Sequence, residues 1–192
     1  MNVSGFGTFD SRAYDDFTVS GGGWVVDTVF MNVLSAIPQS NITTFSWEIR
    51  QGVGAGTGGT LIASGTNAAT VTTTGRSGFG RPEYNVAVTG LNINLADGTY
   101  YLGGKIGGTG TDNDVYVSTT QGANSVGSPI NNNNSWWDST SFAVTWVPAT
   151  QGLGGTTADF SMGVGGSVVP EPASMIALGA GLLGLAARRR RK

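Results

Sequence analysis

Hydrophobic and polar residues alternate along most of the chain with a period of two, which is typical of β-strands that bury one face. No stretch of roughly 12 residues with the 3.6-residue period of an amphipathic helix precedes residue 173. The alternation is clearest in four triplets: Phe45, Trp47 and Ile49; Tyr84, Val86 and Val88; Leu91, Ile93 and Leu95; Phe142, Val144 and Trp146. The pattern predicts further strands at residues 14–19, 24–34, 61–64, 69–73, 99–106, 115–119 and 159–164.

Segments rich in Gly, Asn and Asp separate these strands, and such residues accept the positive φ that tight turns need. They occupy residues 21–23, 52–59, 96–98, 107–114 and 131–134. About eight to ten strands in one domain predict an all-β fold, an antiparallel β-sandwich that resembles a jelly roll. We expect three parts: a β-sandwich ectodomain over residues 1–162, a Gly-rich linker over 163–168 and a separate C-terminal segment over 169–192.

Disorder is the competing interpretation, because Gly occupies 32 of the 192 positions and only 11% of the residues are charged. The aromatic residues favour a folded core instead. Each can bury about 150–250 Å² of surface, and many of them stand at alternating positions of predicted strands. The predicted anchors of the core are Trp24, Phe30, Phe45, Trp47, Tyr84, Tyr100, Phe142 and Trp146.

Composition excludes several classes of function. With no Cys and no His, the chain has no disulfide, thiolate metal site, imidazole ligand or Ser-His-Asp triad. The formal net charge of -2 is unevenly distributed, because the last five residues are all basic. Without them, five basic and 12 acidic residues remain. An acidic body without a basic stripe predicts no binding to nucleic acid.

The C-terminal basic cluster follows an uncharged, mostly apolar run at residues 173–187. A helix of this length spans about 22 Å, against a hydrocarbon core of roughly 30 Å, and Arg side chains that reach back to the interface help such a short span to cross. A buried helix of a soluble domain is the alternative, but it gives no reason for the terminal arginines. We therefore predict a single C-terminal transmembrane helix anchored by Ala173, Met175, Ile176, Leu178, Leu182, Leu183 and Leu185. The positive-inside rule keeps the basic residues in the cytoplasm: Arg188, Arg189, Arg190, Arg191 and Lys192.

A short motif, Val169, Pro170, Glu171 and Pro172, stands directly before the apolar run. Its prolines favour extended backbone, which is the conformation that protease clefts bind. The alternative is that Pro172 begins the helix, with Glu171 at its positive end. In its order of motif, apolar helix and basic cluster, the tail resembles the PEP-CTERM sorting domain of Gram-negative bacteria.

The resemblance implies that the motif is the substrate of an exosortase, a membrane protease that removes the tail. It also implies export: the chain is held transiently in the inner membrane with its domain outside the cytoplasm, and then reaches the cell surface or the extracellular space. Family members begin with a secretory signal peptide, whereas residues 1–12 contain neither a basic nor an apolar region. We expect the natural start to lie upstream.

The segment Asp112-Asn113-Asp114 is a candidate calcium site, because it presents alternating oxygen ligands in a loop of Gly and Thr. Asp15 and Asp16 are further candidate ligands from a distant part of the chain. The alternative is an ordinary Asx turn. We expect no cofactor other than this Ca²⁺.

Trp136 and Trp137 form a candidate glycan platform, because adjacent side chains of a strand point to opposite faces and one indole can therefore face a sugar. The alternative is that one indole packs in the core and the other covers an edge of the sheet.

Catalysis by paired carboxylates needs neither His nor Cys, but the spacing of the available residues brings no pair together. These residues are Glu48, Glu83, Asp27 and Asp138. We therefore expect no enzyme, and predict an exported cell-surface or extracellular-matrix protein with a structural or adhesive role. The alternative function is a carbohydrate-binding module for extracellular polysaccharide.

Overall fold

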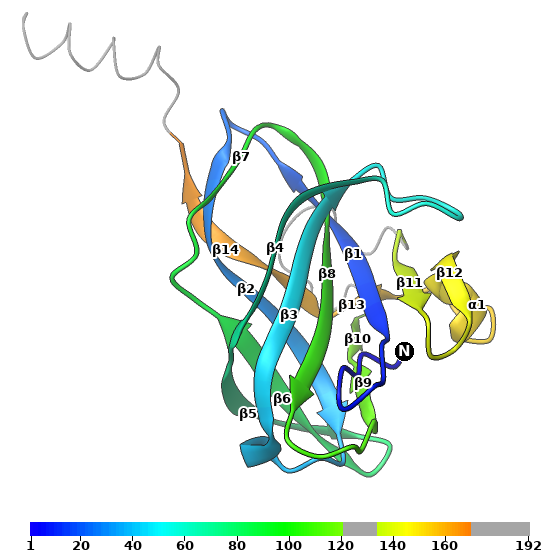
Figure 1. Cartoon of the computed structure of the whole chain (residues 1–192). Helices are drawn as coiled ribbons and strands as arrows, with labels where there is room; N and C mark the ends of the chain where they lie inside the picture. The colour runs from blue at the N-terminus through cyan, green and yellow to red at the C-terminus, as the bar shows by residue number, and fades with distance from the viewer. Residues whose placement is uncertain (121–133, 170–192) are drawn as a thin grey trace, which may run out of the picture.

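Two antiparallel β-sheets enclose one hydrophobic core (Figure 1). The computed structural model describes residues 1–120 and 134–169. One sheet has the strand order β12-β11-β1-β8-β3-β4, and the other has the order β14-β2-β6-β5, with β7 and β9 also paired to β2. We call them the first and the second sheet. The prediction of an all-β, antiparallel fold is confirmed.

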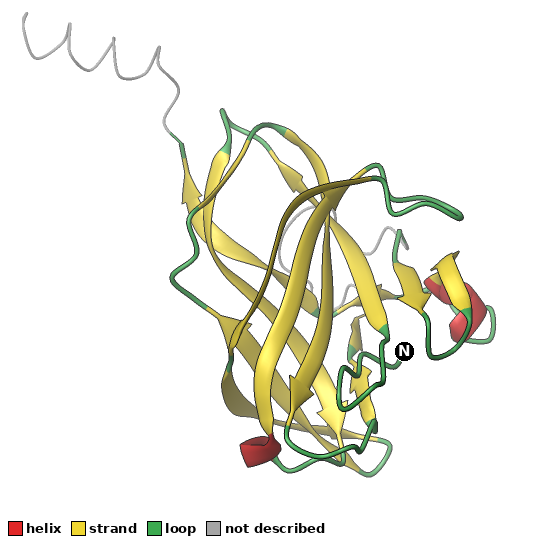
Figure 2. Cartoon of the chain, in the orientation of Figure 1, coloured by secondary structure: helices red, strands yellow, loops and turns green. Residues whose placement is uncertain are grey.

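The strands of the first sheet are β1 (Arg12–Val19), β3 (Ile42–Gln51), β4 (Thr60–Ala68), β8 (Gly98–Gly108), β11 (Trp136–Ser139) and β12 (Val144–Pro148). Those of the second sheet are β2 (Trp24–Ser35), β5 (Thr70–Gly78), β6 (Arg81–Val88), β7 (Ile93–Leu95), β9 (Val115–Val117) and β14 (Met162–Val168). A small separate ladder joins β10 (Thr119–Thr120) to β13 (Asp159–Phe160). Within the described residues the helices are the short η1 (Gln39–Asn41) and α1 (Ala149–Gly152), as Figure 2 shows.

The core follows the alternation of the sequence. Phe45, Trp47 and Ile49 of β3 are almost completely buried, and they meet the buried side chains of β2 and β6 from the second sheet. Burying such a side chain contributes about 1.5–3 kcal/mol. The buried residues that β2 and β6 contribute are Val26, Val29, Met31, Val33, Tyr84, Val86 and Val88.

Three predicted core anchors lie outside the core. Phe30 of β2 is half-buried and is not part of the hydrophobic core cluster. Phe142 is 48% exposed, because the chain turns at this point and β12 begins only at Val144. Its ring packs against Phe9 and Trp137. Trp146 is half-buried against the outer face of the first sheet. For Phe30, Phe142 and Trp146 the predicted place in the core is wrong.

The Gly-rich segment 163–168, which the sequence predicts to be a linker, is part of β14. It pairs with β2 from Met162 opposite Met31 to Val168 opposite Trp24, so the linker prediction is wrong. These glycines let β14 and β2 approach each other closely and do not make the segment flexible. A Cβ at Gly163 would contact the Phe30 ring at 3.2 Å, and one at Gly166 would lie 2.1 Å from the carbonyl oxygen of Val25. Gly166 stands at a shift in register, where β14 crowds the backbone of β2.

This crowding predicts that alanine destabilises the protein at one of two neighbouring glycines and has little effect at the other. Gly166→Ala forces a methyl group into the Val25 backbone, and we expect it to lower the free energy of unfolding by about 1–3 kcal/mol. Gly165→Ala is the matched control, because its Cβ would meet Thr28 at an ordinary 3.4 Å, and we expect a change within about 0.5 kcal/mol. Urea unfolding of both variants measures the difference. Equal stabilities would contradict the pairing of β14 with β2.

Candidate functional site

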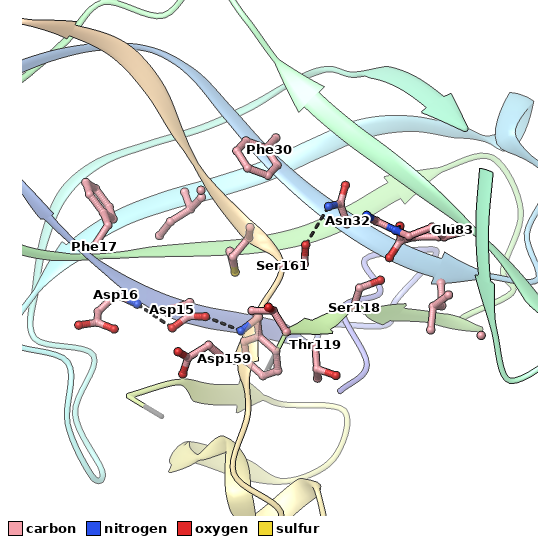
Figure 3. A pocket seen from close by; sticks show the side chains of 18 of the residues that line it. Asp15, Asp16, Phe17, Phe30, Asn32, Glu83, Ser118, Thr119, Asp159 and Ser161 are labelled. Atoms are coloured by element: carbon pink, nitrogen blue, oxygen red, sulfur yellow. Dashed lines mark hydrogen bonds and ion pairs between the residues drawn. The ribbon is translucent and has the colours of Figure 1, made fainter. Parts of the chain in front are cut away.

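A groove of about 570 Å³ opens where β1 of the first sheet faces β2 and β14 of the second (Figure 3). β11 pairs with β1 only from Arg12 to Tyr14, so the groove residues Asp15, Asp16 and Phe17 lie beyond that pairing. The polar residues labelled around it come from both sheets and from the β10–β13 ladder: Asp15, Asp16, Asn32, Glu83, Ser118, Thr119, Asp159 and Ser161.

Asp15 bridges the two sides of the groove. Its carboxylate is buried and accepts a hydrogen bond from the backbone N–H of Phe160 on β13, and a second one, of 3.0 Å, from the N–H of Asp16. Burial raises the pKa of this carboxyl well above its usual range. The neighbouring charges of Asp159 and Asp16 raise the pKa further, while the two backbone hydrogen bonds oppose the rise.

The floor of the groove is a hydrogen-bonded junction at Asn32 of β2. The side-chain Nδ2 of Asn32 donates to Ser161 Oγ at 2.8 Å, and its Oδ1 accepts from Asn85 Nδ2 at 2.9 Å. Its backbone N–H donates to Ser161 O, and its carbonyl accepts from Ser118 N, both at 2.8 Å. The junction therefore fixes the ends of β9 and β14 against β2.

Ser118 presents a buried hydroxyl to this groove. The residue is 7% exposed, and its hydroxyl lies beside the carboxylate of Glu83. Burial opposes the change, but hydrogen bonds from Ser118, Thr74 and Arg76 lower the pKa of the Glu83 carboxyl. Phe30 adds an aromatic surface to the same groove. Carboxylate, amide and hydroxyl groups beside an aromatic ring suit a ligand that carries several hydroxyl groups.

The sequence did not single out Asn32, Ser118 or Ser161. The signal for Asn32 was its position, an amide within the apolar strand at residues 24–34. The two serines carried no signal, because the backbone hydrogen bonds that hold them connect distant parts of the chain.

A second cluster occupies the outer face of the first sheet, around Glu48. Its carboxylate pairs with Arg12 and with Arg50, whose Nε lies 2.5 Å from Oε2, and it accepts a hydrogen bond of 3.3 Å from the hydroxyl of Tyr14. The guanidinium of Arg50 stands 5.1 Å from the ring centroid of Trp146, which also packs on Tyr14 at 4.5 Å. Glu48 thus holds the side chains of Arg12, Arg50 and Tyr14 in place on the outer face of the first sheet.

Trp146 adopts a φ of 46°, which is unusual for a bulky residue. A Cβ at Gly58 would lie 2.3 Å from its ring, so the glycine makes room for the indole. The Glu48 cluster and the 52–59 loop together hold this strained backbone in place.

The other predicted carboxylates lie on separate strands and have separate partners. Glu83 of β6 pairs with Arg76 at 2.6 Å, Asp27 of β2 accepts from Thr28, and Asp138 of β11 accepts from Trp146 N.

Trp136 and Trp137, the predicted glycan platform, are both half-buried on β11. Trp137 Nε1 donates to Ser11 Oγ at 2.8 Å, and its ring packs on Phe142. Trp136 Nε1 donates to Asn134 Oδ1 at 3.2 Å. Both indole N–H groups are therefore already used within the protein, and sugar binding at this pair stays a prediction.

The predicted calcium loop has internal partners. Asp112 Oδ1 accepts from the backbone N–H of Asp114, as in an Asx turn, and the Asp114 carboxylate binds the guanidinium of Arg81 at 2.6–3.0 Å. Asp15 and Asp16 lie in the groove. In the part of the chain that the structure describes, no group of three or more acidic side chains is arranged to hold a metal ion. Calcium binding at Asp112 and Asp114 stays a prediction.

The predicted sorting motif after Val169, the apolar anchor and the basic cluster all lie outside the described residues. Val169 itself donates its backbone N–H to Gly23 O at 2.8 Å. Within residues 1–120 and 134–169, no helix is long and apolar enough to cross a membrane.

The family model of the PEP-CTERM protein-sorting motif matches residues 168–191. No curated protein and no solved structure matches the chain. The chain thus carries a PEP-CTERM motif, which supports export, transient membrane anchoring and processing by exosortase.

The buried carboxyl of Asp15 predicts a pH dependence of stability. Its pKa in the folded state lies above the ordinary value of 3.8, so the folded protein holds this proton more tightly than the unfolded chain. The contribution of Asp15 to the free energy of unfolding therefore falls as the pH rises from about 4 through the folded-state pKa, by up to about 1.4 kcal/mol per pH unit.

Asp15→Asn cannot titrate, so the advantage of the wild type over this variant should shrink between about pH 4 and pH 7. Urea unfolding at four pH values measures it, with Asp27→Asn as a control at an exposed carboxylate of β2. A constant difference between wild type and Asp15→Asn over this range would show that Asp15 carries no raised pKa.

Proposed function

We propose that this protein is a structural or adhesive component of the bacterial cell surface or extracellular matrix, delivered through exosortase processing of its C-terminal tail. The observation that carries the proposal is the sorting motif at residues 168–191. The fold supports it, because β14 continues to Val168 and Val169 is still bonded to Gly23. The domain ends where the motif begins.

This arrangement suits a protein that is cut after export. The apolar residues 173–187 hold the preprotein in the inner membrane, and the arginines after them stay in the cytoplasm. Cleavage at Pro170-Glu171-Pro172 removes the anchor and leaves every strand of the described domain in place. The released product is an acidic β-domain without an anchor.

Glu171 supplies the only charge of the motif, so its substitution tests the role of the motif as a substrate. Glu171→Gln removes a charge-assisted contact worth about 1.5–3 kcal/mol, and we expect at least about tenfold slower processing. Mass spectrometry of the C-terminus in the native host, with and without exosortase, measures the processed fraction. Asp27→Asn, which neutralises an exposed carboxylate of the domain, is the matched control. Processing of Glu171→Gln at the rate of the control would refute this role.

Carbohydrate binding is the second candidate function, and the groove beside Asp15 favours it. The groove joins the buried Ser118 hydroxyl, the Asn32 junction and the Phe30 ring in a volume typical of small-ligand sites. A sugar offers hydroxyls to the polar groups and a C–H face to the ring. The groove does not include Trp136 or Trp137, so the two candidate sugar sites can be tested separately.

Affinity electrophoresis in the extracellular polysaccharide of the producing bacterium separates the two sites. If the groove binds sugar, Ser118→Ala should weaken retention by about 2–10-fold, the value of one hydrogen bond, and Trp136→Ala should leave it unchanged. The reverse result would assign binding to the Trp pair. No retention of the wild type would exclude this candidate function and leave the proposed structural role intact.

A further inference from the structure

Strand β4 forms an uncharged edge of the first sheet. Its nine residues, Thr60–Ala68, are all exposed or half-buried and include no Asp, Glu, Lys, Arg or Pro. At about 3.3 Å per residue the strand is roughly 30 Å long. Such an edge presents unpaired backbone groups to solvent and acts as a template for another strand.

The other edges of the two sheets carry features that limit pairing. β12 is five residues long, ends at Pro148 and is followed by α1. β5 contains Arg76 and loses its register between Thr73 and Ser77, and β14 loses register at Gly166. Bulges, charges and Pro are the devices by which proteins block edge pairing.

Most of β4 has none of these devices. Its register shift is confined to the region opposite Ile49 and Arg50, and residues 63–68 pair regularly with β3. The two large hydrophobic side chains of the strand, Leu61 and Ile62, are 47% and 40% exposed. The strand therefore combines a regular edge over residues 63–68 with two exposed apolar side chains at the adjacent register shift, which another chain can cover.

The distribution of charge indicates which partner fits this edge. Residues 51–82 contain no Asp or Glu, although the chain has 12 acidic residues. Two acidic proteins repel each other over most of their surfaces. A second copy of this chain meets no like charge along β4, because the strand that it presents is uncharged as well.

We propose that β4 pairs with β4 of a second copy, antiparallel and about a two-fold axis at Gly65. The first sheets of the two copies then form one continuous sheet. In this register Ser64 of each copy lies opposite Thr66 of the other, and Ala63 lies opposite Asn67. Small hydroxyl side chains opposite each other are favourable cross-strand pairs, and a two-fold interface uses the same strand twice. The pairing depends on the folded domain alone and is independent of sorting.

Charge substitutions test the proposal in the full chain, kept in detergent micelles. Ser64→Lys/Thr66→Lys places like charges opposite each other across the axis, and sedimentation equilibrium should show association at least tenfold weaker than in the wild type. Ser64→Glu/Thr66→Lys places opposite charges face to face and should associate at least as well as the wild type. Thr70→Lys/Thr72→Lys adds the same charge to exposed positions of β5 and should associate like the wild type.

The outcomes are decisive in both directions, provided that circular dichroism shows each variant folded. The proposal is overturned if the wild type is monomeric, or if Ser64→Lys/Thr66→Lys associates as well as the wild type. It is also overturned if Thr70→Lys/Thr72→Lys loses association, or if Ser64→Glu/Thr66→Lys fails to associate. Association through the apolar tail would leave the association of Ser64→Lys/Thr66→Lys unchanged.

Disulfide trapping tests the register, because the chain has no cysteine of its own. A mixture of Ser64→Cys and Thr66→Cys chains brings the two thiols directly opposite each other, at a Cα distance that permits a disulfide. The mixture should cross-link at least tenfold faster than either variant alone, or than Ser64→Cys mixed with Thr72→Cys. Equal rates in all four samples overturn the register.

Discussion

The antiparallel pairing of β14 with β2 determines where the folded domain ends and where the sorting tail begins. It runs from Met162 to Val168, and the bond from Val169 N to Gly23 O extends it by one residue. Because β2 is also paired with β6, the hydrogen bonds between β14 and β2 attach β14 to an inner strand of the second sheet. The sorting tail thus begins at the end of a sheet, and its removal costs the domain no strand.

The same pairing creates the groove. β14 borders β2 up to Met31, and β9 takes over the same edge at Val33. Asn32 lies between these two ladders, and its backbone and side chain bind Ser118 and Ser161 where the strands change. Asp15 reaches this region from the first sheet and holds Phe160 by a hydrogen bond. The polar groove beside these strands is therefore a consequence of the topology.

The local part of the fold could be predicted from the sequence, because alternation depends on each strand alone. Phe45, Trp47 and Ile49 are buried as expected, and so are Tyr84, Val86 and Val88. The sequence predicts a linker at 163–168, because a run of glycines indicates flexibility when the neighbouring strand is not known. In the structure, Gly166 lies against the backbone of Val25, which is distant in the chain. Phe142 and Trp146 have the right period but lie at a turn and on the outer face of a sheet. The sorting motif was recognised from sequence because it is contiguous, whereas the groove is assembled from residues of both sheets.

Hydrogen–deuterium exchange of residues 162–168 in the full-length protein tests the central claim most directly. If β14 is an integral strand, its hydrogen-bonded amides will exchange as slowly as those of β6, which pairs with the opposite edge of β2. Exchange of this segment at the rate of an unstructured peptide, while β6 stays protected, would contradict the account.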